Sequence, residues 1–249
     1  MGTRALEDAA RALAAASRPK RLEYAFWLLP IAAYFIFPRH YLLLNEMVIF
    51  ALFALSLDLI LGYAGVVSLG HAAYFGFGSY AAALFAKHVH PDPLLGLAAT
   101  AAGSALFGFA ASALILRGSD LTRLMLTLGV ALITYELASK LAWLTGGTDG
   151  LQGVAMGPLL GKFDFDLTGR TAYLYSLVVF FVLFLVARRV AHSPFGVSLA
   201  AIRDNKLRAA AIGIPVGWRL AAVNTLAAAY AGVAGALLDR KSTRLNSSH

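Results

Sequence analysis

The hydrophobic residues of this chain are gathered into long runs that are separated by shorter polar stretches. The runs lie at residues 22–37, 43–61, 66–86, 94–116, 121–142, 171–187 and 218–238. Most of them have about 20 residues, the length that a helix needs to cross roughly 30 Å of hydrocarbon. Because backbone polar groups cannot stay unpaired in lipid, such runs must be helical. The pattern therefore predicts an all-α, polytopic transmembrane bundle with about seven spans.

The composition points to the same class of protein. Hydrophobic residues make up 59% of the 249 positions, charged residues make up 14%, and the mean hydropathy is +0.71. A soluble domain has about 25% charged residues. The net charge of +8 comes from residues between the apolar runs, so it indicates membrane topology rather than binding of nucleic acid. The chain has no cysteine, which excludes disulfides and thiolate metal sites within it.

The basic residues also predict the orientation of the bundle. The segment 188–219 contains one acid, Asp204, and six basic residues: Arg188, Arg189, Arg203, Lys206, Arg208 and Arg219. Since Lys and Arg concentrate in cytoplasmic loops, this segment is expected to be cytoplasmic. Counting backwards through the spans places the amino terminus and residues 117–123 inside, and residues 87–93 and 143–170 outside.

The two ends of the chain are interpreted separately from the transmembrane domain, residues 22–238. Residues 1–21 are expected to form a cytoplasmic tail, because no convincing cleavage site of a signal peptide follows their basic residues. Residues 239–249 turn abruptly polar and resemble the translated read-through of a sequencing adapter. They are therefore expected to be a non-native tail on a truncated protein.

A glycine-rich motif lies at the start of the third run. It reads Gly62-Tyr-Ala-Gly-Val-Val-Ser-Leu-Gly-His71 and continues to Tyr80, with five glycines in 17 residues. Glycine allows close approach of helices, or an interrupted helix whose freed backbone groups line a cavity. Broken helices are where many transporters hold their substrate. Two interpretations stay open: tight helix packing, or a translocation pathway whose candidate residues are Ser68, Gly70, His71, Phe75 and Gly78.

Three of the titratable residues inside the apolar runs are candidates for a function. Glu46 and Asp58 belong to the second run, and acids within a membrane are functional candidates because a lone buried charge is costly. Glu46 can face the headgroups and Asp58 can pair with a basic group at the cytoplasmic end; a proton relay is the alternative. His71 has no carboxylate or second histidine beside it in the sequence, so no metal site is predicted.

A second glycine-rich segment follows Trp143, which suits an interfacial anchor. It reads Thr145-Gly-Gly-Thr-Asp-Gly-Leu-Gln-Gly153. It lacks the Lys-Ser/Thr pair of a phosphate-binding Walker A loop. It is either a flexible connector or an ordered loop near the substrate entry on the outer face, and its candidate residues are Gly146, Gly147, Thr148, Asp149 and Gly150.

A third segment, His192–Pro215, is too long and too patterned for a plain connector. Ser193 can cap a helix that has Pro194 at its first position. Gly213 can end a second helical stretch, and Pro215 prevents its continuation. Two short helices below the membrane would present a compact, partly basic surface. A solvated or lipid-facing amphipathic loop is the other interpretation.

The three segments together resemble the M-type permease subunit of branched-chain amino-acid ABC importers. The first segment is similar to its GYAG-x-x-SLGHA-x-x-FG-x-G-x-Y signature, Thr145–Gly150 to its TGGTDG loop, and Ser193–Gly213 to its SPFG…AIR-[DE]-N segment. All three occur in the order of the family, and the resemblance covers about residues 40–238. Lys206 departs from the pattern, because a glutamate is common at that position.

The resemblance implies a fold, a function and partners. The chain would be an ABC-importer permease that moves branched-chain or similar hydrophobic amino acids across the prokaryotic inner membrane. It would work with two cytoplasmic ATPases, a related second permease and a periplasmic or lipid-anchored binding protein. ATP would be used on the partners, and no cofactor would be bound here. Residues 191–216 would be the ATPase-coupling segment, with the candidates Arg203, Asp204, Asn205, Lys206, Ala209, Ala210 and Gly213.

Other functions stay open. A related permease for urea, short amides or another small solute has the same features. An intramembrane enzyme would need His71, Asp58 or Asp149 to converge at one depth, whereas the predicted topology places Asp58 towards the inside and Asp149 outside. A membrane scaffold that moves nothing would lack an ATPase partner at residues 193–215.

Overall fold

The computed structural model of the protein describes residues 21–115, 118, 120–147 and 169–245, and within these ranges every regular element is a helix. The helices are α2 (Arg21–Ile36), α3 (Tyr41–Leu57), the π-helix η1 (Asp58–Tyr63), α4 (His71–His88), α5 (Pro93–Ile115), α6 (Asp120–Lys140), α7 (Ala142–Thr145), α8 (Arg170–Ala191), α9 (Pro194–Asp204), α10 (Lys206–Ala211) and α11 (Val216–Leu245). The predicted all-α class is confirmed.

Five helical stretches of the described residues are long and apolar enough to cross a membrane. They are Tyr41–Tyr63, Pro93–Ile115, Leu121–Lys140, Arg170–Ala191 and Val216–Leu238. The first predicted run forms α2, whose apolar part, Trp27–Ile36, is shorter than a span. The third run forms α4, which is helical for 18 residues but carries polar residues at both ends.

One predicted boundary of these runs is wrong. The third run does not start at residue 66, because residues 64–70 are not helical and α4 begins only at His71. The glycines of this stretch account for the break, since Gly65 adopts a φ of +67° that ends a helix. The apolar span of the last run ends at Leu238 as predicted, although helix α11 itself continues to Leu245. The expected non-native origin of residues 239–249 stays a prediction.

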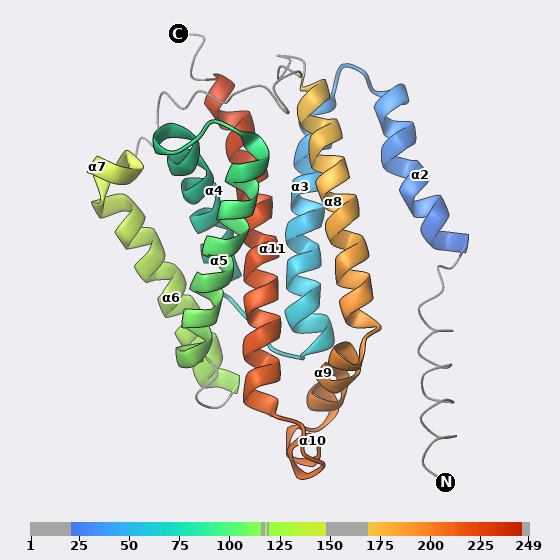
Figure 1. The fold of residues 1–249 in the computed structure, drawn as a ribbon, viewed down its shortest axis with the longest axis vertical. Helices are drawn as coiled ribbons and strands as arrows, with labels where there is room; N and C mark the ends of the chain where they lie inside the picture. Colours follow the sequence, from blue (N-terminus) through green and yellow to red (C-terminus); the bar gives the residue numbers. More distant parts are fainter. Residues whose placement is uncertain (1–20, 116–117, 119, 148–168, 246–249) are drawn as a thin grey trace.

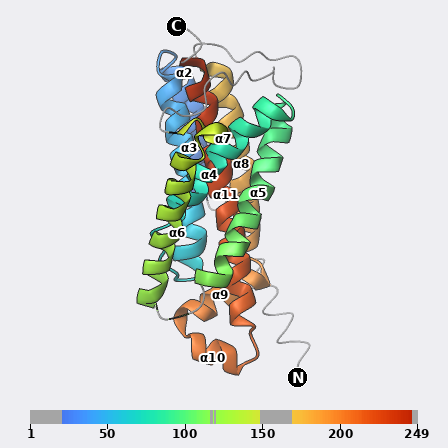
Figure 2. The same ribbon diagram turned by 90° about the vertical axis from the view of Figure 1, so that its left-hand side faces the viewer.

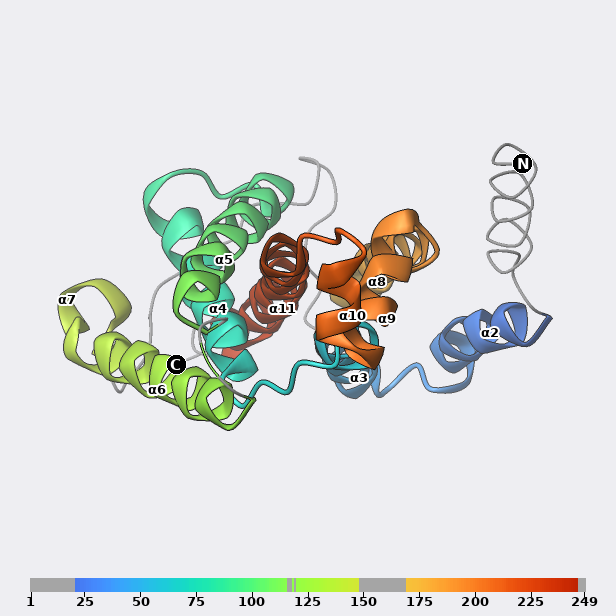
Figure 3. The ribbon, with the colours of Figure 1, turned by 90° about the horizontal axis from the view of Figure 1, so that it is seen from below.

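The helices form an upright bundle around α11 (Figure 1). Helices α3 and α8 lie on one side of α11, helices α4 and α5 lie on the other, and α6 lies beyond α4 (Figures 1 and 3). The short helices α9 and α10 lie together at the lower end (Figure 2). They join the lower ends of α8 and α11, so these two spans run in opposite directions.

Close backbone contacts hold α4 and α5 against α11. A Cβ atom placed on Gly78 of α4 would collide with the carbonyl oxygen of Gly232 on α11, and one placed on Gly232 would collide with Ser104 of α5. Gly108 of α5 is similarly close to Ala228 of α11. Within a membrane, helix association depends on packing, and small residues at the contacts allow backbones to approach. These contacts therefore fix the centre of the bundle.

Aromatic residues attach α2 to the other side of the bundle. The ring of Trp27 lies 5.4 Å from Phe180, 4.7 Å from Phe181 and 5.2 Å from Phe184 of α8, measured between ring centroids. The hydroxyl of Tyr173 donates a 2.7 Å hydrogen bond to the carbonyl oxygen of Pro30. This bond joins α8 to the middle of α2. It therefore holds α2 to the bundle, although α2 lies at the edge in Figure 3.

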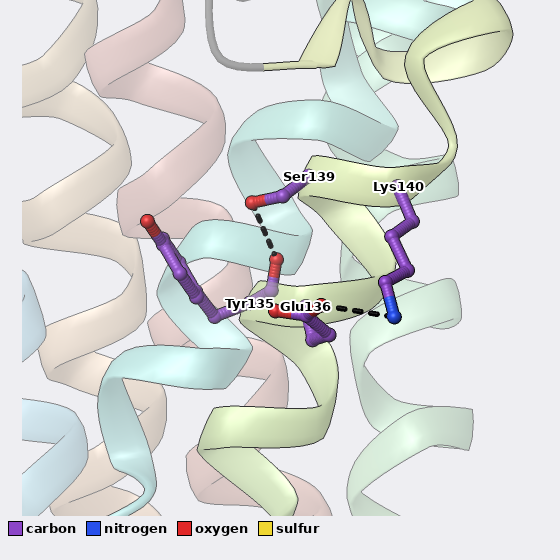
Figure 4. A network of polar contacts seen from close by, with 4 residues as sticks. All are labelled: Tyr135, Glu136, Ser139 and Lys140. Atoms are coloured by element: carbon purple, nitrogen blue, oxygen red, sulfur yellow. Dashed lines mark hydrogen bonds and ion pairs between the residues drawn. The ribbon is translucent and has the colours of Figure 1, made fainter.

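Helix α6 is the peripheral helix on the opposite edge. Few of its apolar residues are covered by the rest of the described chain, so its outward face is left for lipid or a partner. Near its upper end, Lys140 forms a 3.1 Å ion pair with Glu136, and the hydroxyl of Ser139 donates to the carbonyl oxygen of Tyr135 (Figure 4). Both pairs are four residues apart, which is one helical turn, so α6 satisfies these polar groups itself.

Within the predicted transmembrane domain, residues 22–238, basic residues concentrate at the lower end of the bundle. The residues there are Arg123, Arg188, Arg189, Arg203, Lys206, Arg208 and Arg219, in α6, α8, α9, α10 and α11. The upper end of this domain carries Arg39, Lys87, Lys140 and Arg170 together with the acids Asp92 and Glu136, and Arg240, Lys241 and Arg244 follow it in the last turns of α11. Residues 87–93 and 143–147 lie at the upper end, away from α9 and α10 (Figure 1). The helices thus alternate in direction as the charge pattern predicts.

The glycine contact between α4 and α11 can be tested by adding a methyl group. Gly78→Ala is expected to lower the stability of the purified chain by roughly 1–3 kcal/mol, because a Cβ there meets a backbone oxygen that cannot move aside alone. Gly76→Ala is the matched control, since no atom outside its own helix lies within 4 Å of a Cβ at that position. Thermal unfolding in detergent micelles measures both, and equal melting temperatures for the two variants would contradict the contact.

Candidate functional site

The glycine-rich motif forms an interruption between two helices. Helix α3 continues into the π-helix η1, which ends at Tyr63, and α4 starts at His71. The first residues after η1 are still held by it, because the amide of Gly65 donates to the carbonyl oxygen of Leu61 and that of Val66 to that of Ile60. The chain between Val66 and Gly70 then crosses to α4 without regular structure. The structure therefore has an interrupted helix here, and the translocation pathway stays a prediction.

The interruption lies inside the bundle rather than below it. The amide of Leu69 donates to the hydroxyl of Thr127 over 3.2 Å, and a Cβ on Gly70 would collide with the backbone of the same residue. Thr127 lies seven residues into α6, which is about 10 Å along a helix. Figure 1 accordingly shows α4 starting well above the lower ends of α5 and α6. The amino-terminal backbone groups of α4 are thus placed within the depth of the spans.

His71 is the first residue of α4 and is buried, with 2% of its surface exposed. Its Nε2 atom lies 3.1 Å from the hydroxyl of Ser56, which donates its own hydrogen to the carbonyl oxygen of Phe53. A serine hydroxyl has one hydrogen to donate, so Ser56 accepts from His71 and Nε2 carries the proton. Nδ1 is then a bare acceptor, and it has no hydrogen-bond partner within the described chain.

The other candidate residues of the motif have different surroundings. Phe75 stacks on Phe50 and meets Phe53 edge to face, at centroid distances of 6.4 Å and 5.2 Å. Ser68 is half-buried in the irregular stretch. Gly70 and Gly78 lie at the contacts of α4 with α6 and α11. The motif therefore combines close helix packing at its glycines with a buried polar group at His71.

A buried polar cluster lies next to this motif, and the sequence patterns did not single it out. The side-chain amide of Asn224 on α11 donates its two hydrogens to the carbonyl oxygen of Gly108 and the hydroxyl of Ser112, both at 2.9 Å, and its nitrogen lies 3.3 Å from the hydroxyl of Tyr74. These partners belong to α4 and α5, so one side chain connects three helices. The only sequence signal was a single asparagine inside an apolar run, and polar residues there commonly join helices.

An apolar groove on the bundle lies away from these residues. It is lined by Ala105 and Phe109 of α5 and by Trp218, Ala222 and Ala229 of α11, among others. None of the candidate pathway residues lines it. Its position on the outer surface of the α5–α11 pair suits a lipid chain or a neighbouring helix rather than a polar solute.

The second glycine-rich segment begins as a compact turn after α7. The hydroxyl of Thr145 donates to the carbonyl oxygen of Ala138 over 2.6 Å, lies 3.0 Å from that of Leu141, and accepts from the amide of Gly147. Gly146 and Gly147 have φ values of +77° and +63°, which glycine adopts without strain. The start of this segment is therefore ordered. The candidates Thr148, Asp149 and Gly150 lie outside the described residues.

The third segment forms the two short helices that its capping residues predict. The hydroxyl of Ser193 accepts from the amide of Gly196, with Pro194 at the first position of α9. The side chain of Asn205 separates the two helices, since it accepts from the amide of Arg208 at the start of α10 over 2.9 Å. Gly213, with a φ of +88°, follows α10, and Pro215 precedes α11. The predicted caps at Ser193 and Gly213 are confirmed.

The candidate coupling residues face in different directions. Ala209 is buried, whereas Asp204, Asn205, Ala210 and Gly213 are exposed and Lys206 is half-buried. Arg203 reaches back to the bundle and donates to the carbonyl oxygen of Gly62.

The sequence patterns did not single out the apolar residues of α10 and of the turn after it. Leu207 is 85% exposed and Ile212 is 70% exposed, at the end of the bundle beyond the spans. Exposed apolar side chains among basic residues in this position suit a protein partner. Their signal in the sequence was weak, because Leu207 and Ile212 stand alone between polar and small residues.

These features define a class of protein: a multi-pass membrane permease with an interrupted helix inside its bundle and a pair of helices below it. Residues 41–245 match the family described as branched-chain amino acid transport system / permease component. That match covers most of the chain, and the chain therefore belongs to this family.

Two curated relatives are similar to this chain. They are the high-affinity branched-chain amino acid transport system permease proteins LivM of Salmonella typhimurium and of Escherichia coli. Each is 28% identical over 216 residues, covering 76% of this chain and 49% of the relative. The chain thus spans about half the length of the curated relatives it matches. These relatives are transport permeases rather than enzymes. No solved structure matches the chain.

The proton position on His71 can be tested with two amides of different length. His71→Gln keeps an N–H group near the place of Nε2, and His71→Asn does not, so only the first retains the donor to Ser56. We expect His71→Asn to be about 1 kcal/mol less stable than His71→Gln, the usual contribution of one hydrogen bond. Thermal unfolding in detergent measures the difference, with His88→Gln at the exposed end of α4 as the control. The reverse order of stability would contradict the assigned proton.

Proposed function

We propose that this chain is the membrane-spanning part of one permease subunit of an ATP-driven importer, which moves branched-chain or similar hydrophobic amino acids across the prokaryotic inner membrane. The observation that carries the proposal is the pair α9 and α10, which holds Leu207 and Ile212 exposed at the basic end of the bundle. The family match and the names of the relatives support the solute class.

The proposed partners follow from what the chain presents. Two cytoplasmic ATPases would bind at α9 and α10 and would use the ATP, and this chain would bind no cofactor. A related second permease would complete the pore, and a periplasmic or lipid-anchored binding protein would deliver the solute. With the basic end in the cytoplasm, the amino terminus is cytoplasmic and the turn at Gly146 and Gly147 faces outward.

The proposed mechanism is alternating access, in which helices around a site within the membrane rock to open it to either side. The interrupted helix supports this role for residues 62–71, because its break lies within the bundle and its backbone groups are freed there. His71 would meet the solute as a hydrogen-bond acceptor through Nδ1, with Ser68 and Phe75 beside it on the chain. Gly70 and Gly78 would set the helix contacts that allow movement.

The docking role of α10 is tested by changing Leu207 in the complete subunit. Leu207→Glu places a charge where an apolar side chain would be buried by the ATPase, so we expect the amount of co-purified ATPase to fall about tenfold, or roughly 1.4 kcal/mol of binding free energy. Leu207→Met, which keeps an apolar side chain of similar volume, is the matched control. Undiminished ATPase in the Leu207→Glu complex would refute docking at α10.

The orientation is tested by single cysteines, since the chain has none of its own. Val89→Cys lies after α4 at the upper end and Leu207→Cys lies in α10, and both positions are exposed. In cells with a permeable outer membrane, a membrane-impermeant maleimide is expected to label Val89→Cys at once and Leu207→Cys only after lysis. Labelling in the opposite order would reverse the proposed topology.

A further inference from the structure

We propose that Arg203 of α9 is a positioning residue that transmits movement of α9 and α10 to the interrupted-helix segment, residues 62–71. The inference rests on the proposed function, in which an ATPase displaces these two helices. It concerns a contact between two parts of the chain that are 141 residues apart in sequence.

The guanidinium group of Arg203 holds the end of η1. It donates a hydrogen bond to the carbonyl oxygen of Gly62, in the last turn of that helix. The last carbonyl groups of a helix have no partner within it, and a positive charge is favourable near their partial negative charge. A charge-assisted hydrogen bond of this kind is stronger than a neutral one. Arg203 therefore caps η1 from another helix.

The stem of Arg203 rests on the glycine that follows. A Cβ atom placed on Gly65 would lie 2.6 Å from Cγ and 3.3 Å from Cβ of Arg203. Gly65 also has a φ of +67°, so a side chain at this position is disfavoured by both the space and the backbone. The absence of a side chain on Gly65 is what allows the arginine stem to lie against the backbone.

The far end of the same segment is attached to other helices. Leu69 donates to Thr127 of α6, Gly70 is in contact with the backbone of Thr127, and His71 is bonded to Ser56 of α3. The segment thus connects α9, through Arg203, to the start of α4 and to α6. A displacement of α9 would pull on residues 62–65 and so reach the buried break beside His71.

Docking and transmission are carried by different residues. Arg203 has its side chain half exposed and directed to the bundle, whereas Leu207 and Ile212 are exposed beyond it. A second contact of α9, the guanidinium of Arg219 5.3 Å above the Phe195 ring, leads to α11 and not to residues 62–71. Removing Arg203 is therefore expected to leave the ATPase bound and to interrupt the path to the break.

The test uses the complete subunit, reconstituted with its ATPases and sister permease in proteoliposomes with binding protein and radiolabelled leucine. Arg203→Ala is expected to keep the bound ATPase and its ATP hydrolysis, while leucine taken up per ATP falls about tenfold. Arg203→Lys, which keeps the stem and a positive donor, should restore most of the ratio. Arg189→Ala removes a charge from the same end of the bundle, on α8, and is the control.

An unchanged ratio of uptake to hydrolysis in Arg203→Ala would overturn the proposal, and so would loss of the bound ATPase. If the unaltered complex shows no ATP-driven uptake of leucine, the proposed function for this solute fails instead. The two failures are therefore distinguishable.

A disulfide between positions 65 and 203 is a second test of the same contact. The distance of 3.3 Å between the Cβ of Arg203 and a Cβ on Gly65 is slightly shorter than the roughly 3.5–4.5 Å between the Cβ atoms of a disulfide, so the bond forms after a small shift of the two segments. Because the double variant Gly65→Cys, Arg203→Cys lacks the arginine, we expect its leucine uptake per ATP to be low when reduced and to rise when oxidation joins the two parts by a disulfide. Uptake lost on oxidation and regained on reduction would show that the contact must open, and would overturn the proposal. Each single cysteine variant controls for local strain.

Discussion

The contact of α4 and α5 with α11 is the interaction on which the rest of the bundle depends. In lipid, apolar burial does not drive helices together, so the association depends on how closely their backbones approach. Gly78, Gly108 and Gly232 allow that approach. Asn224 then adds two hydrogen bonds to α5 and a 3.3 Å polar contact with Tyr74 of α4, which form only when α4, α5 and α11 are in place. Since an asparagine without partners is costly in a membrane, these bonds fix the position of the three helices as well as their proximity.

The interrupted helix follows from this packing. If α3 and α4 were joined by a turn below the bundle, α4 would start at the level of the other spans, and Tyr74 would not meet Asn224 as it does. Instead residues 64–70 carry the chain back into the bundle as irregular backbone. Such backbone is tolerated at membrane depth only where protein or a cavity covers it. Here Thr127 of α6 and the end of η1 cover the irregular backbone. The peripheral helix α6 is therefore needed to satisfy backbone groups of residues 64–70.

Much of this arrangement could be predicted from the sequence, because apolar run length and capping residues are local signals. The spans of α5, α6 and α8, the cap at Ser193 and the stop at Gly213 are examples. The start of α4 could not be placed, since a glycine-rich apolar run is compatible with both a continuous and an interrupted helix. The bond of His71 to Ser56 and the role of Asn224 depend on partners from other helices. No periodicity within one run encodes them.

The contact between two of the motifs could not be predicted from the sequence either. The Gly62–His71 motif and the Ser193–Gly213 segment are separate in sequence, and each has its own local explanation. In the structure Arg203 of the second lies on Gly62 and Gly65 of the first. Gly65 therefore has two constraints, the backbone turn after η1 and the arginine that covers it. The backbone turn alone would also tolerate asparagine. The space beside Arg203, however, has no room for a Cβ atom, so only glycine fits. The identity of this residue is thus set by a contact between a membrane-embedded break and a helix below the membrane.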